Sequence, residues 1–315
     1  MKDLRIVFMG TPEFAATTLK RLVEENYAIV GVITAPDRPA GRGRKLQQSD
    51  VKRYALEQGL TVLQPTNLKS EDFLDQLKAL RANLQIVVAF RMLPKVVWAM
   101  PEYGTFNLHA SLLPDYRGAA PINWAIINGE TETGVTTFFI DEKIDTGEII
   151  LQQKTSISPE DNAGSLHDKL MVLGADLVVK TVREIEAGTI QTQKQVSDRP
   201  LKEAFKIHKD TCKIDWSQPI ETIHNHIRGL SPYPGAWSHL INGTKEVFVK
   251  IYASSIERTE HNLATGSVIS TKKELKVAVE DGFIDLRELQ LPGKRKMKTA
   301  DVLNGLEIEK NARMS

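Results

Sequence analysis

Short apolar runs alternate with amphipathic stretches through the first half of the chain. The run Leu4–Met9 is almost continuously apolar, which is typical of a strand buried on both faces of a sheet. The residues after Gly10 have the composition of a helix start, with Thr11 expected as the N-cap and Pro12 as the first helical residue. A helix with its apolar residues on one face should follow.

The same alternation recurs as far as residue 187. Strands are expected at residues 29–34, 62–63, 85–90, 105–109 and 134–141, and helices at residues 49–58, 70–80 and 162–187. Gly188 is a typical helix-terminating residue and should end the last helix. The pattern predicts a Rossmann-like, doubly wound α/β domain, with a mostly parallel sheet, helices on both faces and right-handed crossovers.

The second half of the chain has a different pattern. Residues 189–208 are mostly polar and lack periodicity, which is typical of a linker. Beyond them lie five short β-rich runs: Ala236–Ile241, Val247–Tyr252, Ser267–Thr271, Leu275–Val279 and Phe283–Gln290. Asn242-Gly243 predicts a hairpin between the first two. We therefore expect the α/β domain over residues 1–188, a linker over 189–208, and a small OB-like β-barrel over 209–315.

Composition excludes several classes of protein. The 315 residues are 41% hydrophobic and 26% charged, an ordinary globular balance. The one cysteine, Cys212, rules out an internal disulfide or a thiolate metal cluster and fits a reducing compartment. No apolar run approaches the roughly 20 residues needed to span a bilayer, and residues 1–10 read as a strand rather than a signal peptide. We expect a cytoplasmic protein without a membrane partner.

The strand and helix around Gly10 are not expected to form a dinucleotide site. The dinucleotide fingerprint has three glycines, which let the backbone approach a pyrophosphate. Here Gly10 stands alone, Pro12 lacks an N–H donor, and Glu13 would repel an anion. A capped helix packed on a sheet is the better interpretation.

Three polar residues carry the candidate chemistry. Asn107 and His109 lie two apart near the C-terminal end of a predicted strand, so both side chains share a face at the edge where open α/β sheets bind ligands. Asp145 lies in the loop after the next predicted strand, and we expect it to reach the same edge. A carboxylate can fix the tautomer of an imidazole, and an amide can donate to an oxyanion. The trio suits acyl transfer to an amine, although Asn107 and His109 alone could equally be a structural pair.

Other chemistries have weaker support. Ser111 lacks the Gly-x-Ser-x-Gly context of a hydrolase nucleophile. His224 and His226 have no matching ligands nearby, so we expect a solvated or capping role for them and no metal site. Cys212 should be a partly buried small hydrophobe.

Around these residues the chain closely resembles the folate-dependent formyltransferases. The likeness covers nearly all of the chain and rests on the segments IVFMGTPEFA, TAPDRPAGRGRKL, NLHASLLPDYRGAAPINWAI, GETETGVT, IDTGEI and LQLPGKRKM. The similarity is greatest to the members that formylate methionine charged on initiator tRNA. The resemblance implies transfer of a formyl group from 10-formyltetrahydrofolate to the α-amino group, with Asn107, His109 and Asp145 as the catalytic residues.

The resemblance also implies where the formyl donor binds. Its expected contacts are Phe90, Met92, Leu93, Ser111, Leu112, Leu113, Pro114, Ile140 and Asp141. Many family members have glycine after the aromatic residue where this chain has Arg91, and the role of Arg91 stays open.

Two basic segments are candidates for binding tRNA. Residues 35–48 carry four basic residues against Asp37, a net charge of +3, and the resemblance implies that this loop enters the acceptor stem. A second basic cluster lies near the end of the predicted barrel. The expected contacts are Arg38, Arg42, Arg44, Lys45, Lys294, Arg295 and Lys296. Solvated surface segments are the plain alternative for both.

Two other functions remain open from the sequence. A related formyltransferase acting on a nucleotide-linked amino sugar would share the Asn-x-His and Ser-Leu-Leu-Pro motifs, but it would not need the basic loop. A non-catalytic RNA-binding protein would not need Asn107, His109 and Asp145 together. We expect no obligate protein partner.

Overall fold

The computed structural model describes residues 2–40 and 45–315, and the chain packs into two compact units. Unit 1 comprises Met1–Arg117, Gly134–Thr155 and Asp168–Lys202, and unit 2 comprises Gly118–Thr133, Ser156–His167 and Glu203–Ser315. Each unit is therefore built from three separate stretches of the chain. The domain boundaries expected at residues 188 and 209 stay a prediction.

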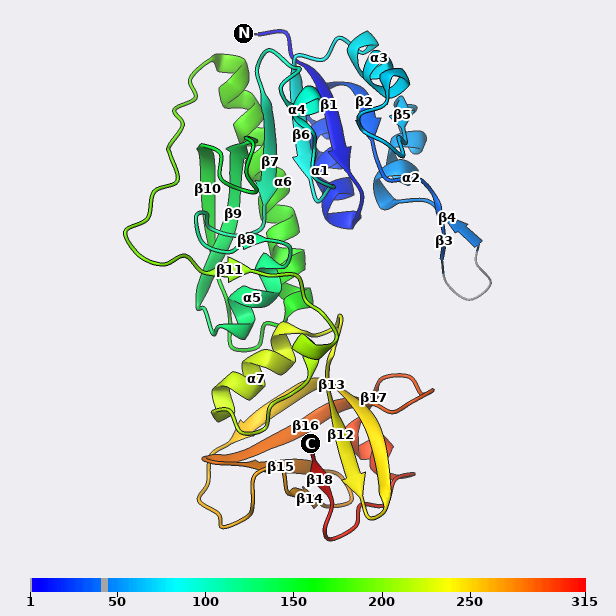
Figure 1. The fold of residues 1–315 in the computed structure, drawn as a ribbon, viewed down its shortest axis with the longest axis vertical. Coiled ribbons are helices and arrows are strands. Elements are labelled where there is room, and N and C mark those ends of the chain that lie inside the picture. Colours follow the sequence, from blue (N-terminus) through cyan, green and yellow to red (C-terminus); the bar gives the residue numbers. More distant parts are fainter. Residues whose placement is uncertain (1, 41–44) are drawn as a thin grey trace. The chain divides into compact units, whose positions relative to one another are not determined.

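A seven-stranded sheet with the order β10-β9-β7-β6-β1-β2-β5 forms the centre of unit 1 (Figure 1). Its strands are β1 (Arg5–Gly10), β2 (Ala28–Ile33), β5 (Val62–Leu63), β6 (Leu84–Val88), β7 (Thr105–His109), β9 (Glu132–Phe139) and β10 (Ile149–Ser156). The neighbours from β7 to β5 pair in parallel, whereas β7 and β9 pair antiparallel. The expected Rossmann-like, mostly parallel sheet is confirmed.

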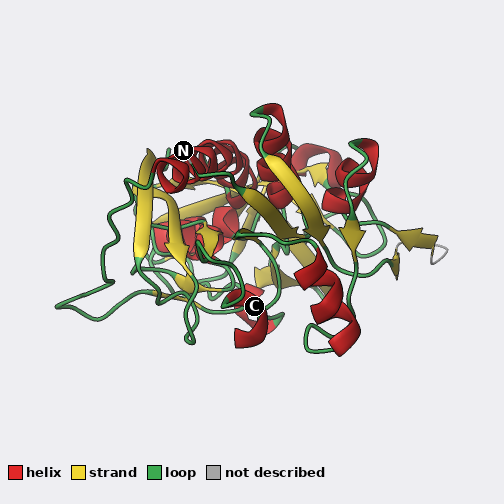
Figure 2. Cartoon of the chain, turned by 90° about the horizontal axis from the view of Figure 1, so that it is seen from above, coloured by secondary structure: helices red, strands yellow, loops and turns green. Residues whose placement is uncertain are grey.

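Helices cover both faces of this sheet, as Figure 2 shows from above. They are α1 (Glu13–Glu24), α2 (Asp50–Glu57), α3 (Glu71–Ala79), α4 (Lys95–Trp98) and α6 (Ala163–Ala187). Val7 and Met9 of β1 pack with residues of α3 and α4. On β7, Leu108 lies against Gly174 of α6, where an added Cβ would stand only 2.8 Å from the leucine. Asn107 and His109 alternate with Leu108 and so occupy the face opposite α6.

The helix ends agree with the sequence pattern, with one correction. Ser49 caps α2 by accepting from the backbone N–H of Lys52, and Gly188 ends α6 with a φ of 71°. Thr11 is not the N-cap of α1. Pro12 takes that position with extended dihedrals, so helical geometry begins one residue later than expected, at Glu13.

The basic segment 35–48 contains two short strands that the pattern did not predict. β3 (Arg38–Ala40) pairs antiparallel with β4 (Lys45–Gln47), and Figure 1 shows this hairpin projecting from the sheet unit. Strands of three residues are too short to display an alternating pattern.

Unit 2 contains a nearly closed antiparallel barrel. Its strands follow the order β14-β15-β16-β13-β12-β18, with β17 beside β16. They are β12 (Ala236–Asn242), β13 (Lys245–Glu257), β14 (Val268–Ser270), β15 (Leu275–Val279), β16 (Gly282–Gln290), β17 (Met297–Lys298) and β18 (Arg313–Met314). A bridge between Ser267 and Arg313 brings the two ends of the sheet together. The expected barrel is confirmed, and β17 and β18 were too short to predict.

The predicted hairpin joins β12 to β13, but its loop differs by one residue. Asn242 pairs with Lys245 at the end of the ladder, so Gly243 and Thr244 form the turn. The Asn242 side chain donates to the carbonyl of Glu307 at 2.8 Å and accepts from the N–H of Glu309 at 2.8 Å. Its amide therefore holds a distant loop instead of the turn.

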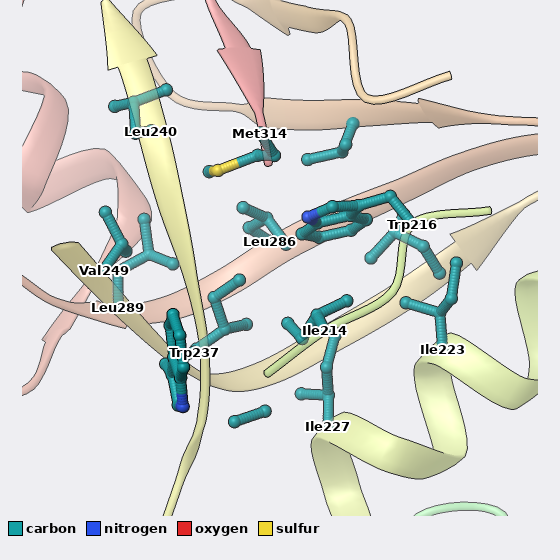
Figure 3. Packing of buried hydrophobic residues seen from close by; sticks show 14 of the residues in the cluster. Ile214, Trp216, Ile223, Ile227, Trp237, Leu240, Val249, Leu286, Leu289 and Met314 are labelled. Carbon is teal, nitrogen blue, oxygen red and sulfur yellow. The ribbon is translucent and has the colours of Figure 1, made fainter. Parts of the chain in front are cut away.

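The barrel interior and helix α7 (Ile220–Gly229) share one hydrophobic core (Figure 3). Trp216, Ile223 and Ile227 point into it together with Leu286 of β16. The remaining elements of the chain are β8 (Arg117–Gly118), α5 (Pro121–Ile127), β11 (Glu203–Ala204), the 3-10 helix η1 (Asp210–Cys212) and α8 (Thr299–Leu303). Cys212 is 3% exposed and belongs to the same core, as its size and polarity suggest.

Candidate active site

Strand β7 positions the first two candidate residues. Asn107 and His109 lie on the same face of this strand, and His109 is the last residue of the strand. His109 is only 6% exposed, whereas Asn107 is half-buried. The structure thus places an amide and an imidazole side by side near the carboxyl edge of the parallel strands β6 and β7.

The His109 ring is fixed by two neighbours. Its Nε2 lies 2.8 Å from the carbonyl oxygen of Tyr116, and because a carbonyl can only accept, Nε2 carries a proton. Its Nδ1 faces Oδ2 of Asp145 at 3.8 Å, beyond hydrogen-bond distance but within the range of an ion pair with an imidazolium. We expected Asp145 to fix the tautomer. The carbonyl of Tyr116 does so instead.

Asp145 reaches His109 by a route that differs from the expected one. Because β9 runs antiparallel to β7, Phe139 at the end of β9 pairs with Phe106, whereas His109 pairs with Thr136. The loop after β9 therefore starts about 10 Å from His109 along the strand, at about 3.3 Å per residue. The loop then folds back, and Asp145 takes a positive φ of 54°. Asp145 and His109 therefore meet because the loop folds back, and not because their strands end at the same edge of the sheet.

The return of this loop depends on close backbone packing. The N–H of Phe139 donates to the carbonyl of Glu148 at 3.0 Å, which closes the loop at its base. A Cβ on Gly147 would lie 1.7 Å from the carbonyl oxygen of Phe139, so only glycine fits there. The Asp141 carboxylate accepts from the backbone N–H of Lys143 and the hydroxyl of Thr146, and it thus braces the loop from within.

Gln195 is a residue that sequence reasoning missed. Its Nε2 donates to the carbonyls of Asp145 at 3.0 Å and Gly147 at 2.7 Å. Its Oε1 accepts from Nε and Nη2 of Arg117, at 3.1 and 2.7 Å. Gln195 lies in the polar, non-periodic stretch interpreted as a linker, and nothing in that pattern distinguishes it from its neighbours.

The Ser-Leu-Leu-Pro loop after β7 is tied down by Thr136 of β9. The buried Thr136 hydroxyl donates to the carbonyl of Ser111 at 2.6 Å and accepts from the N–H of Leu113 at 3.1 Å. Ser111 is fully buried and donates to the carbonyl of Asp115 at 2.7 Å. Leu113 packs with Phe138 and is also buried. These bonds give Ser111 and Leu113 structural partners, while Leu112 and Pro114 stay half-buried at the loop surface.

The other predicted donor contacts lie near one hydrophobic cluster. Leu93 is a buried member of this cluster, and Phe90 and Ile140 pack against it. Met92 is 72% exposed, which leaves its side chain available to a ligand. Arg91 donates to the backbone carbonyls of Pro65 and Thr66. It therefore braces the segment before α3.

The basic candidates lie in both units. Arg38 is exposed on β3, while Arg42 and Arg44 lie outside the described residues, and only the backbone of Lys45 is described. Asp37, the acidic residue of the loop, forms a 2.6 Å ion pair with Lys52, whose side chain is mostly buried. Within unit 2, Lys294, Arg295 and Lys296 are exposed, and Lys296 forms a 2.8 Å ion pair with Glu288.

The two histidines of α7 lie in a different environment from the one expected. His224 and His226 are not solvated: both are partly buried on α7, and burial lowers the pKa of each imidazole.

Over the described residues, no group of three or more His, Cys, Asp or Glu side chains is arranged to hold a metal ion. No helix in that part of the chain is long and apolar enough to cross a membrane.

Comparison with known proteins agrees with the fold and the motifs. A family model described as formyl transferase matches residues 4–182, and one described as formyl transferase, C-terminal domain, matches residues 206–307. A sugar 3N-formyl transferase solved with dTDP and 5-N-formyl-THF has a TM-score of 0.65 at 21% identity, covering 94% of this chain and all of that one. HypX from Aquifex aeolicus, solved with tetrahydrofolic acid, has a TM-score of 0.65 at 17% identity, covering 98% of this chain and 49% of that one. These two structures share the fold.

Relatives of higher identity extend over the full length. The methionyl-tRNA formyltransferase of Flavobacterium johnsoniae is 58% identical and covers 100% of both chains. Those of Flavobacterium psychrophilum and Bacteroides fragilis are 59% and 54% identical over at least 98% of each chain. With both family models matched and relatives this similar from end to end, the chain belongs to the formyl transferase family.

Proposed function

We propose that this enzyme transfers the formyl group of 10-formyltetrahydrofolate to the free α-amino group of methionyl-initiator tRNA. The observation that carries the proposal is the approach of His109 and Asp145 to 3.8 Å beside Asn107. It is supported by full-length relatives that are named methionyl-tRNA formyltransferase. The product is formylmethionyl-tRNA, which serves translation initiation.

In the reaction, the α-amine attacks the formyl carbon of the donor. A bond forms between the amine nitrogen and this carbon, and the bond from the carbon to N10 of the folate breaks. The amine loses one proton and N10 gains one, so no external oxidant or reductant is needed. The negative charge that develops on the formyl oxygen is the feature that the enzyme must stabilise.

Asn107 and His109 supply this stabilisation. The amide of Asn107 donates to the oxyanion, and the imidazolium of His109, a side chain that is only 6% exposed, places a positive charge beside it. The bond from Nε2 to the carbonyl of Tyr116 holds the ring in place. Asp145 faces Nδ1 at 3.8 Å and assists in moving the amine proton through water.

The formyl donor binds along the loops that follow β6, β7 and β9. Met92, Leu112 and Pro114 have exposed or half-exposed side chains that suit the planar pterin. Phe90, Leu93 and Ile140 support these loops through one buried hydrophobic cluster, and Ser111, Leu113 and Asp141 keep the loops in shape through their hydrogen bonds. Backbone groups of these loops bind the polar edge of the pterin.

The tRNA binds through charge on both units. Arg38, Arg42, Arg44 and Lys45 of the basic segment 35–48 bind the acceptor stem, and Asp37 does not oppose them because Lys52 neutralises it. Lys294, Arg295 and Lys296 bind the tRNA backbone. The enzyme acts in the cytoplasm and requires no obligate protein partner.

The test is an assay of the purified protein with 10-formyltetrahydrofolate and three acceptors: methionyl-initiator tRNA, methionyl-elongator tRNA and a nucleotide-linked amino sugar. We expect rapid formylation of the first, at least tenfold slower formylation of the second, and none of the third. Formylation of the amino sugar alone would support the sugar-acting alternative. Binding of tRNA without any transfer would support a non-catalytic RNA-binding protein.

A further inference from the structure

We propose that Gln195 is a positioning residue that holds the catalytic loop of Asp145 against His109. This inference rests on the proposed function, because it assigns Gln195 a role through Asp145. The side-chain hydrogen bonds of Gln195 go to the backbone carbonyls of Asp145 and Gly147 and to Arg117. Gln195 bridges the two backbone segments that carry the partners of His109.

The need for such a residue follows from the topology. The antiparallel direction of β9 starts the Asp145 loop beside Phe106, about 10 Å along the strand from His109. Within residues 2–40 and 45–315, no strand pairing brings Asp145 back, and its backbone takes a positive φ of 54°, a conformation uncommon for residues other than glycine. Other contacts must therefore hold the loop in this conformation.

The Gln195 side chain supplies these contacts, and every donor and acceptor of its amide takes part in a hydrogen bond. Its two N–H groups reach the carbonyls of Asp145 and Gly147, on either side of Thr146. Its oxygen accepts two hydrogen bonds from Arg117, the residue that follows Tyr116, whose carbonyl binds His109. An amide with two donors and two lone pairs is fully used. One side chain thus links the loop of Asp145 to the loop that orients His109.

The backbone around Gln195 is itself anchored. Gln193 exchanges two backbone hydrogen bonds with Ile149 of β10, at 2.8 and 2.9 Å. At the other end of the segment, Asp115 forms an ion pair with Arg199 and accepts from the N–H of Lys202. Residues 193–202 are therefore attached at both ends, to β10 through Gln193 and to the loop after β7 through Asp115. Gln195 lies between these two attachments.

The central test uses two variants of Gln195 and one matched control. Gln195→Met removes all four hydrogen bonds at nearly constant size. Gln195→Glu keeps the acceptor for Arg117 but loses both donors to the loop. We expect each to lower kcat by about 10- to 100-fold, because small displacements of catalytic groups cost factors of this size. KM for donor and tRNA should stay within about threefold. Exposed Gln191, which lies outside residues 193–202, is the control: changed to Met or Glu, it should keep kcat within about twofold of wild type.

A double variant separates positioning from a general loss of stability. If Gln195 acts through Asp145, then Gln195→Met should lower kcat no more than about twofold further in an Asp145→Asn background. Multiplicative losses in the double variant would overturn the proposal, and so would wild-type kcat in a folded Gln195→Met protein. Wild-type kcat in Gln195→Glu would also overturn the proposal, because it would show that only the hydrogen bonds with Arg117 matter for turnover.

A readout without catalysis distinguishes failure of this inference from failure of the proposed function. Amide hydrogen exchange in residues 139–148 should be faster in Gln195→Met than in wild type, while exchange in β1 and β6 stays the same. Unchanged exchange in the loop would overturn the inference even if the enzyme formylates tRNA. Faster loop exchange, together with wild-type turnover in Asp145→Asn, would leave Gln195 as the anchor of the loop and contradict the catalytic role of Asp145.

Discussion

His109 lies at the point where three separate parts of unit 1 meet. Strand β7 places His109 at the sheet edge. The carbonyl of Tyr116 accepts a hydrogen bond from Nε2, and the loop after β9 supplies Asp145. The two ring nitrogens therefore have different surroundings: Nε2 is used for orientation, and Nδ1 faces the carboxylate. A change at His109 should affect the chemistry far more than it affects substrate binding.

Replacing His109 or Asp145 tests this separation. His109→Gln should lower kcat by about 100- to 10,000-fold, the range that a single acid–base group contributes, with little change in KM. Asp145→Asn keeps the shape but removes the charge facing Nδ1, and it should lower kcat by about 10- to 1,000-fold. Steady-state kinetics with methionyl-initiator tRNA measure both effects. Near-wild-type kcat in either variant would contradict the assigned roles.

At the scale of elements, the loop between β9 and β10 is the part of the site under most steric constraint. Gly147→Ala would place a Cβ 1.7 Å from the carbonyl oxygen of Phe139, so the loop must move. We expect a loss of about 1–3 kcal/mol in the free energy of unfolding, typical of overpacking, and a fall of at least tenfold in kcat. Thermal unfolding and kinetics measure these. Gly305→Ala, where the added Cβ meets no atom within 4 Å, is the control and should leave both nearly unchanged.

Helix α7 carries a pH-dependent contribution to stability. Burial lowers the pKa of His226, and its buried Nε2 has no hydrogen-bond partner among the described residues. The folded state therefore keeps His226 neutral, while the unfolded state takes up a proton near its ordinary pKa of about 6.5. The contribution is present above that pH and is lost as the pH falls further, by up to about 1.4 kcal/mol per pH unit.

Unfolding midpoints at pH 7.5 and pH 5.5 test this contribution. His226→Gln should show a smaller loss between the two values than wild type, because the titrating group is gone. Exposed His208→Gln should show the wild-type loss. Equal pH dependence in wild type and His226→Gln would contradict the assignment. Burial also lowers the pKa of His224, so some acid sensitivity should remain in the variant.

At the scale of the whole molecule, the net charge of +1 conceals local basic segments. Binding of tRNA through several phosphates should make the logarithm of kcat/KM fall steeply and linearly with the logarithm of salt concentration. Arg42→Ala should weaken formylation and reduce that slope by about one, because one phosphate contact is lost. Exposed Lys69→Ala, with the same charge change, should leave the slope unaltered. A flat response to salt in the wild-type enzyme would contradict phosphate binding.

Local patterns were sufficient to predict most of the elements. The apolar run before Gly10 became β1, Ser49 capped α2, and the run Leu275–Val279 became β15 with the expected bounds. Segments of two or three residues, such as β3 and β18, were not predicted because alternation needs a longer stretch to be visible. The one-residue shift at Pro12 has a similar origin, since composition alone does not set the dihedrals of a helix start.

The sequence by itself determined the two classes of fold and the identity of the polar residues near the site, because hydrophobic periodicity and short motifs are local properties of the chain. Only the tertiary structure decided how these residues meet. The antiparallel direction of β9, the folded-back loop that brings Asp145 to His109, and the bridge through Gln195 all join residues distant in sequence. Such contacts depend on the packing of the whole unit, which no local pattern encodes.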